Sequence, residues 1–156
     1  MFTVRDSTII AIDPMHDSGI WCSAKLVNCK PGKWESFVVK TEDDQWGSKI
    51  KSLTVIHFDY KNQTNLQYFK LDRMVGVTSG LAGFFEKKSF DDVFRAGREE
   101  FFHKNIDKTV QNNIKYFSYG VAVSSGYGNG DYDIEMSVNP ANQIIALRIA
   151  FLPSFD

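Results

Sequence analysis

Three carboxylates recur at every second position in the segment SSGYGNGDYDIEM, residues 124–136. Asp131, Asp133 and Glu135 follow a glycine-rich turn. Side chains two residues apart point to the same face of a β-strand. Oxygen atoms gathered on one face can bind a cation or accept hydrogen bonds from a polyol. The same pattern also describes the solvated side of an ordinary hairpin, so the neighbouring residues must decide between the two.

A hairpin turn is predicted at Asn129-Gly130, because a type I′ turn needs a positive φ at both central residues. In this register Tyr127 lies opposite Tyr132, and the apolar side chains of both strands share one face. A second turn, of four residues at 139–142, then adds the next strand. The two turns together predict a C-terminal three-strand antiparallel meander over residues 119–152.

The position of Arg148 separates the two interpretations of the acidic face. In the predicted register Arg148 lies opposite Asp133, and a fixed positive charge there opposes cation binding. The sequence therefore favours an ion-paired, solvated face. The alternative is a small-ligand or cation-binding β module that uses Asp131, Asp133 and Glu135, with Arg148 and Tyr127 beside them.

Two further groups combine a carboxylate with an imidazole. Asp13, His16 and Asp17 lie within DPMHDSG and have the chemistry of transition-metal ligands, but a polar turn after Asp-Pro is the simpler interpretation. His57 and Asp59 share one strand face, an arrangement that suits acid–base chemistry. A hydrolase that uses His57 and Asp59 is thus another alternative, although the sequence places no nucleophile beside them.

Composition and motifs exclude several classes of protein. The 156 residues carry a formal net charge of −1, which gives no electrostatic mark of nucleic-acid binding. The chain has no P-loop, no G-x-S-x-G elbow and no H-E-x-x-H motif, so we expect no cofactor and no metal. It shows no signal-peptide pattern and no membrane-length apolar run. With Cys22 and Cys29 expected as free thiols, these features predict a cytoplasmic location.

Short strands between turn signals account for most of the chain, which is typical of a β-sandwich. The segment LTVIHFDY, residues 53–60, is apolar on both faces and predicts a strand in the middle of a sheet. The predicted strands are residues 2–5, 8–12, 19–27, 34–41, 49–60, 66–71, 73–78, 81–85, 116–125, 131–138 and 144–152. We therefore expect a single domain over residues 1–156, mainly β (α+β by content), with a two-layer sandwich-like fold.

One segment, residues 89–104, breaks the strand pattern and predicts an amphipathic helix. Phe90 and Phe94 lie on one helical stripe, which indicates a face that packs against a sheet. Ser89 and Asp92 have the spacing of a capping box at the start of this helix, with Asp92 in the place that glutamate usually takes.

Five short stretches follow one another along the chain: IIAIDP, KPGKW, GVTSGLAGFF, GYGNGDYDI and IIALRIAFL. In type and order they resemble a family of small bacterial proteins known only as a domain of unknown function. The resemblance implies a compact, β-rich, stand-alone domain and supplies no activity and no catalytic residue. Near the turn that family tends to have Gly-Asp-Gly, whereas this chain has Gly128-Asn129-Gly130.

Without a catalytic triad, a metal cluster or a cofactor loop, the sequence favours a non-catalytic cytoplasmic binding protein over an enzyme. Such a protein senses or neutralises a protein partner, as an immunity protein neutralises its toxin. We expect the partner to be neither nucleic acid nor a membrane.

Overall fold

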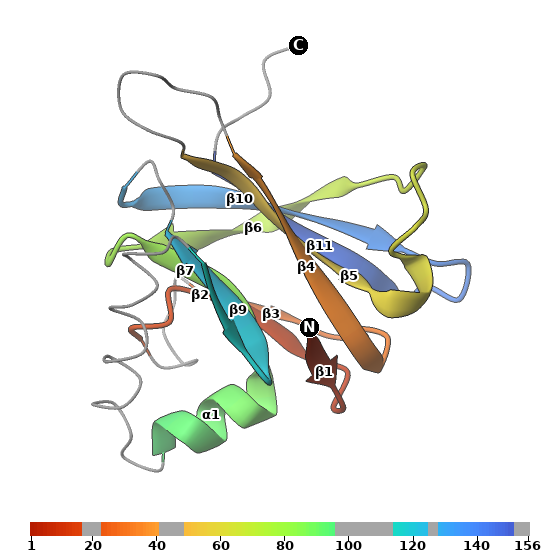
Figure 1. The fold of residues 1–156 in the computed structure, drawn as a ribbon, viewed down its shortest axis with the longest axis horizontal. Helices are drawn as coiled ribbons and strands as arrows, with labels where there is room; N and C mark the ends of the chain where they lie inside the picture. Colours follow the sequence, from red (N-terminus) through yellow and green to blue (C-terminus); the bar gives the residue numbers. More distant parts are fainter. Residues whose placement is uncertain (17–22, 41–48, 96–113, 125–127, 152–156) are drawn as a thin grey trace.

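In the residues that it describes, the computed structural model has two β-sheets and one α-helix (Figure 1). It describes residues 1–16, 23–40, 49–95, 114–124 and 128–151. The six-stranded sheet has the order β1 (Phe2–Val4), β4 (Gly32–Lys40), β5 (Ile50–His57), β11 (Ile144–Ala150), β10 (Gly130–Val138) and β6 (Phe69–Val77). The five-stranded sheet has the order β3 (Ala24–Leu26), β2 (Ile9–Ile12), β7 (Leu81–Glu86), β9 (Gly120–Ser124) and β8 (Ile114–Phe117). The predicted mainly β, sandwich-like fold with one helix is confirmed.

The main hydrophobic core lies between the two sheets. Alternating side chains of β5 are buried, as expected for a strand with one face in a core. The core combines residues of the six-stranded sheet with residues of the five-stranded sheet, among them Trp34, Leu53, Val55, Ile134, Leu147, Ile9, Phe84 and Val121. The prediction of a central strand at 53–60 is confirmed for β5, which pairs with β4 and β11. Residues Phe58–Tyr60 instead form a short 3-10 helix, η1.

The helix α1 (Lys87–Arg95) packs on the outer side of the five-stranded sheet, below β7 and β2 in Figure 1. Phe90 is fully buried there, with its ring centroid 5.1 Å from that of Phe85. The predicted capping box is wrong, because the helix begins two residues before Ser89. The Ser89 hydroxyl donates to the Glu86 carboxylate at 2.6 Å rather than capping a helix end with Asp92. The Phe94 side chain and residues 96–104 lie outside the described residues.

The predicted C-terminal meander is only partly correct. β10 pairs with β11 as expected, but its other neighbour is β6. β9 lies in the five-stranded sheet between β7 and β8, where Val121, Ala122 and Val123 are buried on both faces. The main core covers β9 on one side and the helix cluster covers it on the other. In the predicted hairpin β9 would lie beside β10 in the six-stranded sheet, where only one side of a strand faces the core. The type I′ turn is also wrong, because positive φ falls at Gly128 (85°) and Gly130 (157°) and not at Asn129.

The register between β10 and β11 differs from the prediction by two residues. Glu135 lies opposite Arg148, and Asp133 lies opposite Ala150. A shift of two keeps every side chain on its predicted face, whereas a shift of one would invert the strand. The difference arises where the chain turns back, since the pairing is irregular between Ser137 and Val138.

Two other strand boundaries differ from the prediction. Residues 116–125 were expected as one strand, and the structure has two, β8 and β9, because the chain turns at residues 118–119. Residues 66–71 and 73–78 were expected as two strands, and the structure has one strand, β6, whose pairing with β10 shifts between Asp133 and Glu135.

Candidate functional site

The predicted acidic residues lie on the outer face of the six-stranded sheet, which is the face turned away from the five-stranded sheet. At its centre the Arg148 guanidinium donates to both carboxylate oxygens of Glu135, at 3.0 Å from Nε and 3.0 Å from Nη2. The Arg148 guanidinium also stacks 4.0 Å from the ring centroid of Tyr68. The predicted pairing of Arg148 with Asp133 is therefore wrong, and Glu135 takes that place.

The other carboxylates of this face do not converge on a common point. Asp133 forms an ion pair with Lys70, with 3.4 Å between Nζ and Oδ2. Asp131 is exposed and lies opposite Gly76 of β6. Tyr127 lies outside the described residues. Asp133 and Glu135 are therefore each balanced by a cation from a neighbouring strand.

Apolar side chains border this face on both sides. Phe37 and Val39 of β4 are 42% and 52% exposed, and Met74 of β6 is 46% exposed. Two rows of paired residues cross the sheet between them: Phe37, Thr54, Arg148, Glu135 and Lys70, and then Val39, Ser52, Ala150, Asp133 and Met74. In the second row the short side chains of Ser52 and Ala150 lie between Val39 and the Asp133–Met74 pair. These ten residues form the central part of the outer face.

The apolar border was not predicted from the sequence as a functional surface. In WESFVVK the alternation places Trp34 and Val38 in the core and Phe37 and Val39 on the opposite side. The sequence feature that could have indicated this surface is the presence of apolar residues on both faces of one strand. A strand that is buried on both sides has the same pattern, so the pattern alone does not show whether the second face is exposed.

The His57 side chain is occupied by backbone groups at both ring nitrogens. Nδ1 accepts a hydrogen bond from the Asp59 backbone N–H at 3.1 Å, and Nε2 lies 2.8 Å from the Pro31 carbonyl oxygen, to which it donates. The residue is 4% exposed and packs edge-on against Trp34. A general base needs a free nitrogen lone pair facing a substrate. This geometry makes His57 a structural residue that joins η1 to the start of β4.

Asp13 and His16, which the sequence offered as possible metal ligands, also form structural contacts. The fully buried Asp13 carboxylate accepts hydrogen bonds from the backbone N–H groups of Thr78 (2.9 Å) and Ser79 (2.8 Å) and from the Ser79 hydroxyl (2.6 Å). His16 Nε2 lies 2.7 Å from the Thr78 hydroxyl oxygen. Asp13 thereby joins the end of β2 to the turn between β6 and β7. Asp17 lies outside the described residues.

Elsewhere in the described chain the buried polar groups have structural contacts. These parts contain no group of three histidine, cysteine or carboxylate residues placed to hold a metal ion. Every buried polar side-chain atom in them has a hydrogen-bond partner.

Cys29 is a buried free thiol, as predicted, and burial raises the pKa of this thiol to about 12, so it stays protonated. Cys22 and His103 lie outside the described residues. None of the described helices is long and apolar enough to cross a bilayer.

Comparison with known proteins gives no relative: no family model, no curated protein and no solved structure matches the chain. The resemblance to a bacterial family of unknown function remains a prediction.

Proposed function

We propose that this chain is a non-catalytic binding protein of the cytoplasm that contacts a protein partner through the outer face of its six-stranded sheet. Exposed Phe37, Val39 and Met74 around the Arg148–Glu135 pair are the observation that carries this proposal. Aromatic residues, methionine and arginine are enriched at protein interfaces relative to the rest of the surface. Phe37 and Val39 lie on β4 and Met74 lies on β6, with three strands between them on the same face. Apolar side chains exposed on one shared face favour an interaction surface there.

The central ion pair suits a contact surface. Arg148 is held in one geometry by Glu135 on one side and by the Tyr68 ring on the other. A side chain that is already ordered loses less conformational entropy when a partner covers it. Ser52 and Ala150, which have short side chains, pair with each other in the neighbouring row.

The contacts of the titratable residues support a function without catalysis. The ring nitrogens of His57 and the carboxylate of Asp13 are used to hold the fold together. The alternative cation site receives less support, because Arg148 occupies both oxygens of Glu135 and Lys70 neutralises Asp133. Partner sensing and immunity both need a contact surface and no catalytic group, so the proposal includes these classes.

The experiment is affinity capture from the native cells with the full chain and two variants. We expect a partner to be retained by the wild type and lost by the double variant Phe37→Thr/Val39→Thr. Threonine is a good strand former, so the fold is preserved while the apolar border is removed.

The matched control is Tyr116→Thr, which removes a side chain that is 57% exposed on β8 of the five-stranded sheet. This variant should retain the partner at the wild-type level. Loss of the partner from the control, or equal retention by the double variant, would contradict the use of the outer face.

A further inference from the structure

A separate cleft of about 330 Å³ lies at one end of the six-stranded sheet. Its walls are the segment from η1 to the start of β6 and the turn between β10 and β11, which lie together at the right of Figure 1. The polar and aromatic part of its lining consists mainly of Tyr60, Gln63, Asn65, Gln67, Phe69 and Asn139. No residue of the lining carries a charge, although charged residues make up 24% of the chain.

The two walls are tied together by a buried amide. Asn139 is 9% exposed, and its Nδ2 donates to Gln143 Oε1 at 3.1 Å and lies 3.4 Å from the Tyr60 hydroxyl oxygen. Its Oδ1 accepts a hydrogen bond from the Gln143 backbone N–H at 2.9 Å. The Tyr60 oxygen accepts from Asn139, so its own hydrogen remains available to a ligand. The cleft is therefore largely preformed, as ligand sites usually are.

The polar groups at the mouth are amides. Gln63, Asn65 and Gln67 are exposed, and their side chains form no hydrogen bond with other residues in the described chain. Each amide offers both a donor and an acceptor, the combination that a sugar hydroxyl also has. Phe69 stands beside them with 54% of its surface exposed and offers an aromatic face to a ring of C–H groups.

The nearby charges are directed elsewhere. Lys61 Nζ lies 3.6 Å from Glu35 Oε2 and 4.0 Å from the centroid of the Phe58 ring, and Lys70 pairs with Asp133. An anionic or cationic ligand would leave water for a cleft that holds no opposite charge, which is unfavourable. A wholly apolar ligand would cover these amides without bonding to them, at the cost of their hydrogen bonds to water.

We propose that this cleft binds an uncharged saccharide, with one sugar ring stacked on Phe69 and its hydroxyls bonded to the amides and to Tyr60. This site lies apart from the outer face and does not depend on the proposed protein contact.

The test is a titration of the full chain, labelled with ¹⁵N, with glucose, galactose, mannose and N-acetylglucosamine at millimolar concentration. At least one of these sugars should shift side-chain amide signals of Gln63, Gln67 or Asn139. Phe69→Ala should weaken that binding by about tenfold, as expected for loss of an aromatic contact. Phe58→Ala, which removes an aromatic ring that is 41% exposed on η1 outside the cleft lining, should leave the affinity unchanged.

Glucuronate and glucose 6-phosphate provide the charge control, and both should fail to shift the same signals. Equal or tighter binding of these anions would overturn the proposal, as would the absence of shifts with all four neutral sugars. Shifts caused by a neutral tripeptide amide and by no sugar would also overturn it, because they would assign the cleft to peptide recognition.

Discussion

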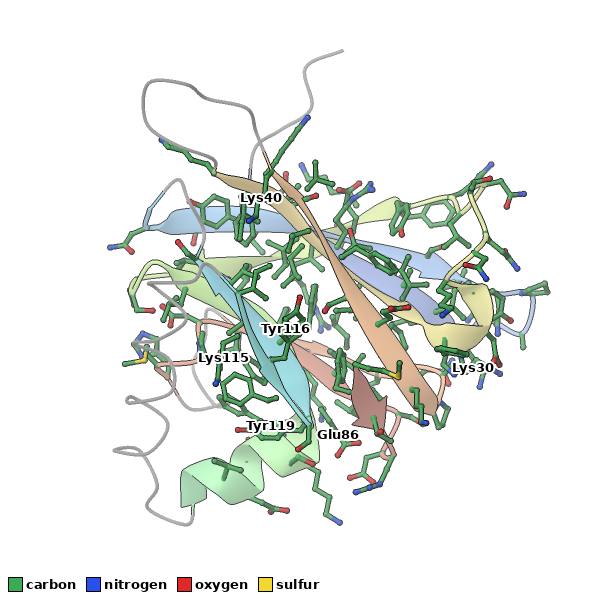
Figure 2. All side chains as sticks on the ribbon, in the orientation of Figure 1. Lys30, Lys40, Glu86, Lys115, Tyr116 and Tyr119 are labelled. Atoms are coloured by element: carbon green, nitrogen blue, oxygen red, sulfur yellow. The ribbon has the colours of Figure 1, made fainter. Side chains whose placement is uncertain are left out.

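Buried polar side chains in this protein join segments that are distant in sequence. Asp13 connects β2 to the turn after β6, and His57 connects η1 to Pro31. Glu86 accepts hydrogen bonds from the Arg5 backbone N–H and from Ser89, at the place where α1 meets the sheet (Figure 2). A buried polar group without a partner is costly, so residue types that suggest catalysis often have this structural use.

Gly32 tests the structural role of His57. Its φ is 128°, and a Cβ at this position would lie 2.7 Å from His57 Nε2. Gly32→Ala should therefore destabilise the protein through both backbone strain and loss of the Pro31 hydrogen bond, by about 2–4 kcal/mol in total. Denaturant melts measure the change in the free energy of unfolding.

The control for this substitution is Gly80→Ala. Gly80 also has a positive φ, 78°, but a Cβ added there would meet no atom within 4 Å. It should cost only the backbone strain, and so at least about 1 kcal/mol less than Gly32→Ala. Equal costs would show that the close approach to His57 has no energetic weight.

Cys29 predicts a dependence of stability on alkaline pH. Burial raises the pKa of its thiol from 9.0 to about 12. As the pH rises, the unfolded chain loses this proton first, so the stabilising contribution is complete below pH 9 and is lost as the pH approaches 12. Urea melts from about pH 8 to about pH 10.5 should show falling stability, and Cys29→Ala should show a smaller fall. An identical fall in the variant would contradict burial of the thiol.

Secondary-structure elements were largely predictable from the sequence, and their partners were not. Alternation and turn residues located most strands because the side-chain period of a strand is a local property. The assignment of β9 to the hairpin failed because burial of Val121 and Val123 against the main core depends on residues far away in the chain. For the same reason the face of Glu135 was predicted correctly, but its partner was not: the predicted register put Ala146 opposite Glu135, and the structure has Arg148 there.

The helix α1 depends on its packing against the five-stranded sheet. Phe90 fills the space beside Phe85, and Phe90→Ala should destabilise the protein by about 3–5 kcal/mol. Asp92 is exposed on the same helix, and Asp92→Ala should change stability by less than about 0.5 kcal/mol. Denaturant melts of the two variants measure the difference, and a cost below about 1 kcal/mol for Phe90→Ala would contradict the packing.

The two ion pairs of the outer face should differ in strength. Glu135 is more buried and doubly bonded to Arg148, so Glu135→Gln should cost about 1–3 kcal/mol. Asp133 pairs with an exposed Lys70, so Asp133→Asn should cost less than about 1 kcal/mol. Millimolar calcium or magnesium should leave the melting temperature of the wild type unchanged, since a ligand of the native state would raise it. A rise with calcium that is lost in Asp133→Asn would instead assign a cation site.

At the scale of the whole molecule, the two sheets are covered unequally. The five-stranded sheet has the main core on one side and α1 on the other, whereas the six-stranded sheet has Phe37, Val39 and Met74 exposed on its outer face. The sequence predicted the sandwich but not this asymmetry, because the exposed side of a strand depends on where the helix settles. This asymmetry is the reason that we propose the outer face as the contact surface.

Site-specific photo-cross-linking in the native cells tests this account most directly. A photoreactive benzoylphenylalanine replaces Phe37 in one chain and Tyr116, exposed on the five-stranded sheet, in another. We expect irradiation to give a discrete cross-linked protein adduct from position 37 and none from position 116. The absence of an adduct at position 37, or the same adduct from both positions, would contradict a partner on the outer face.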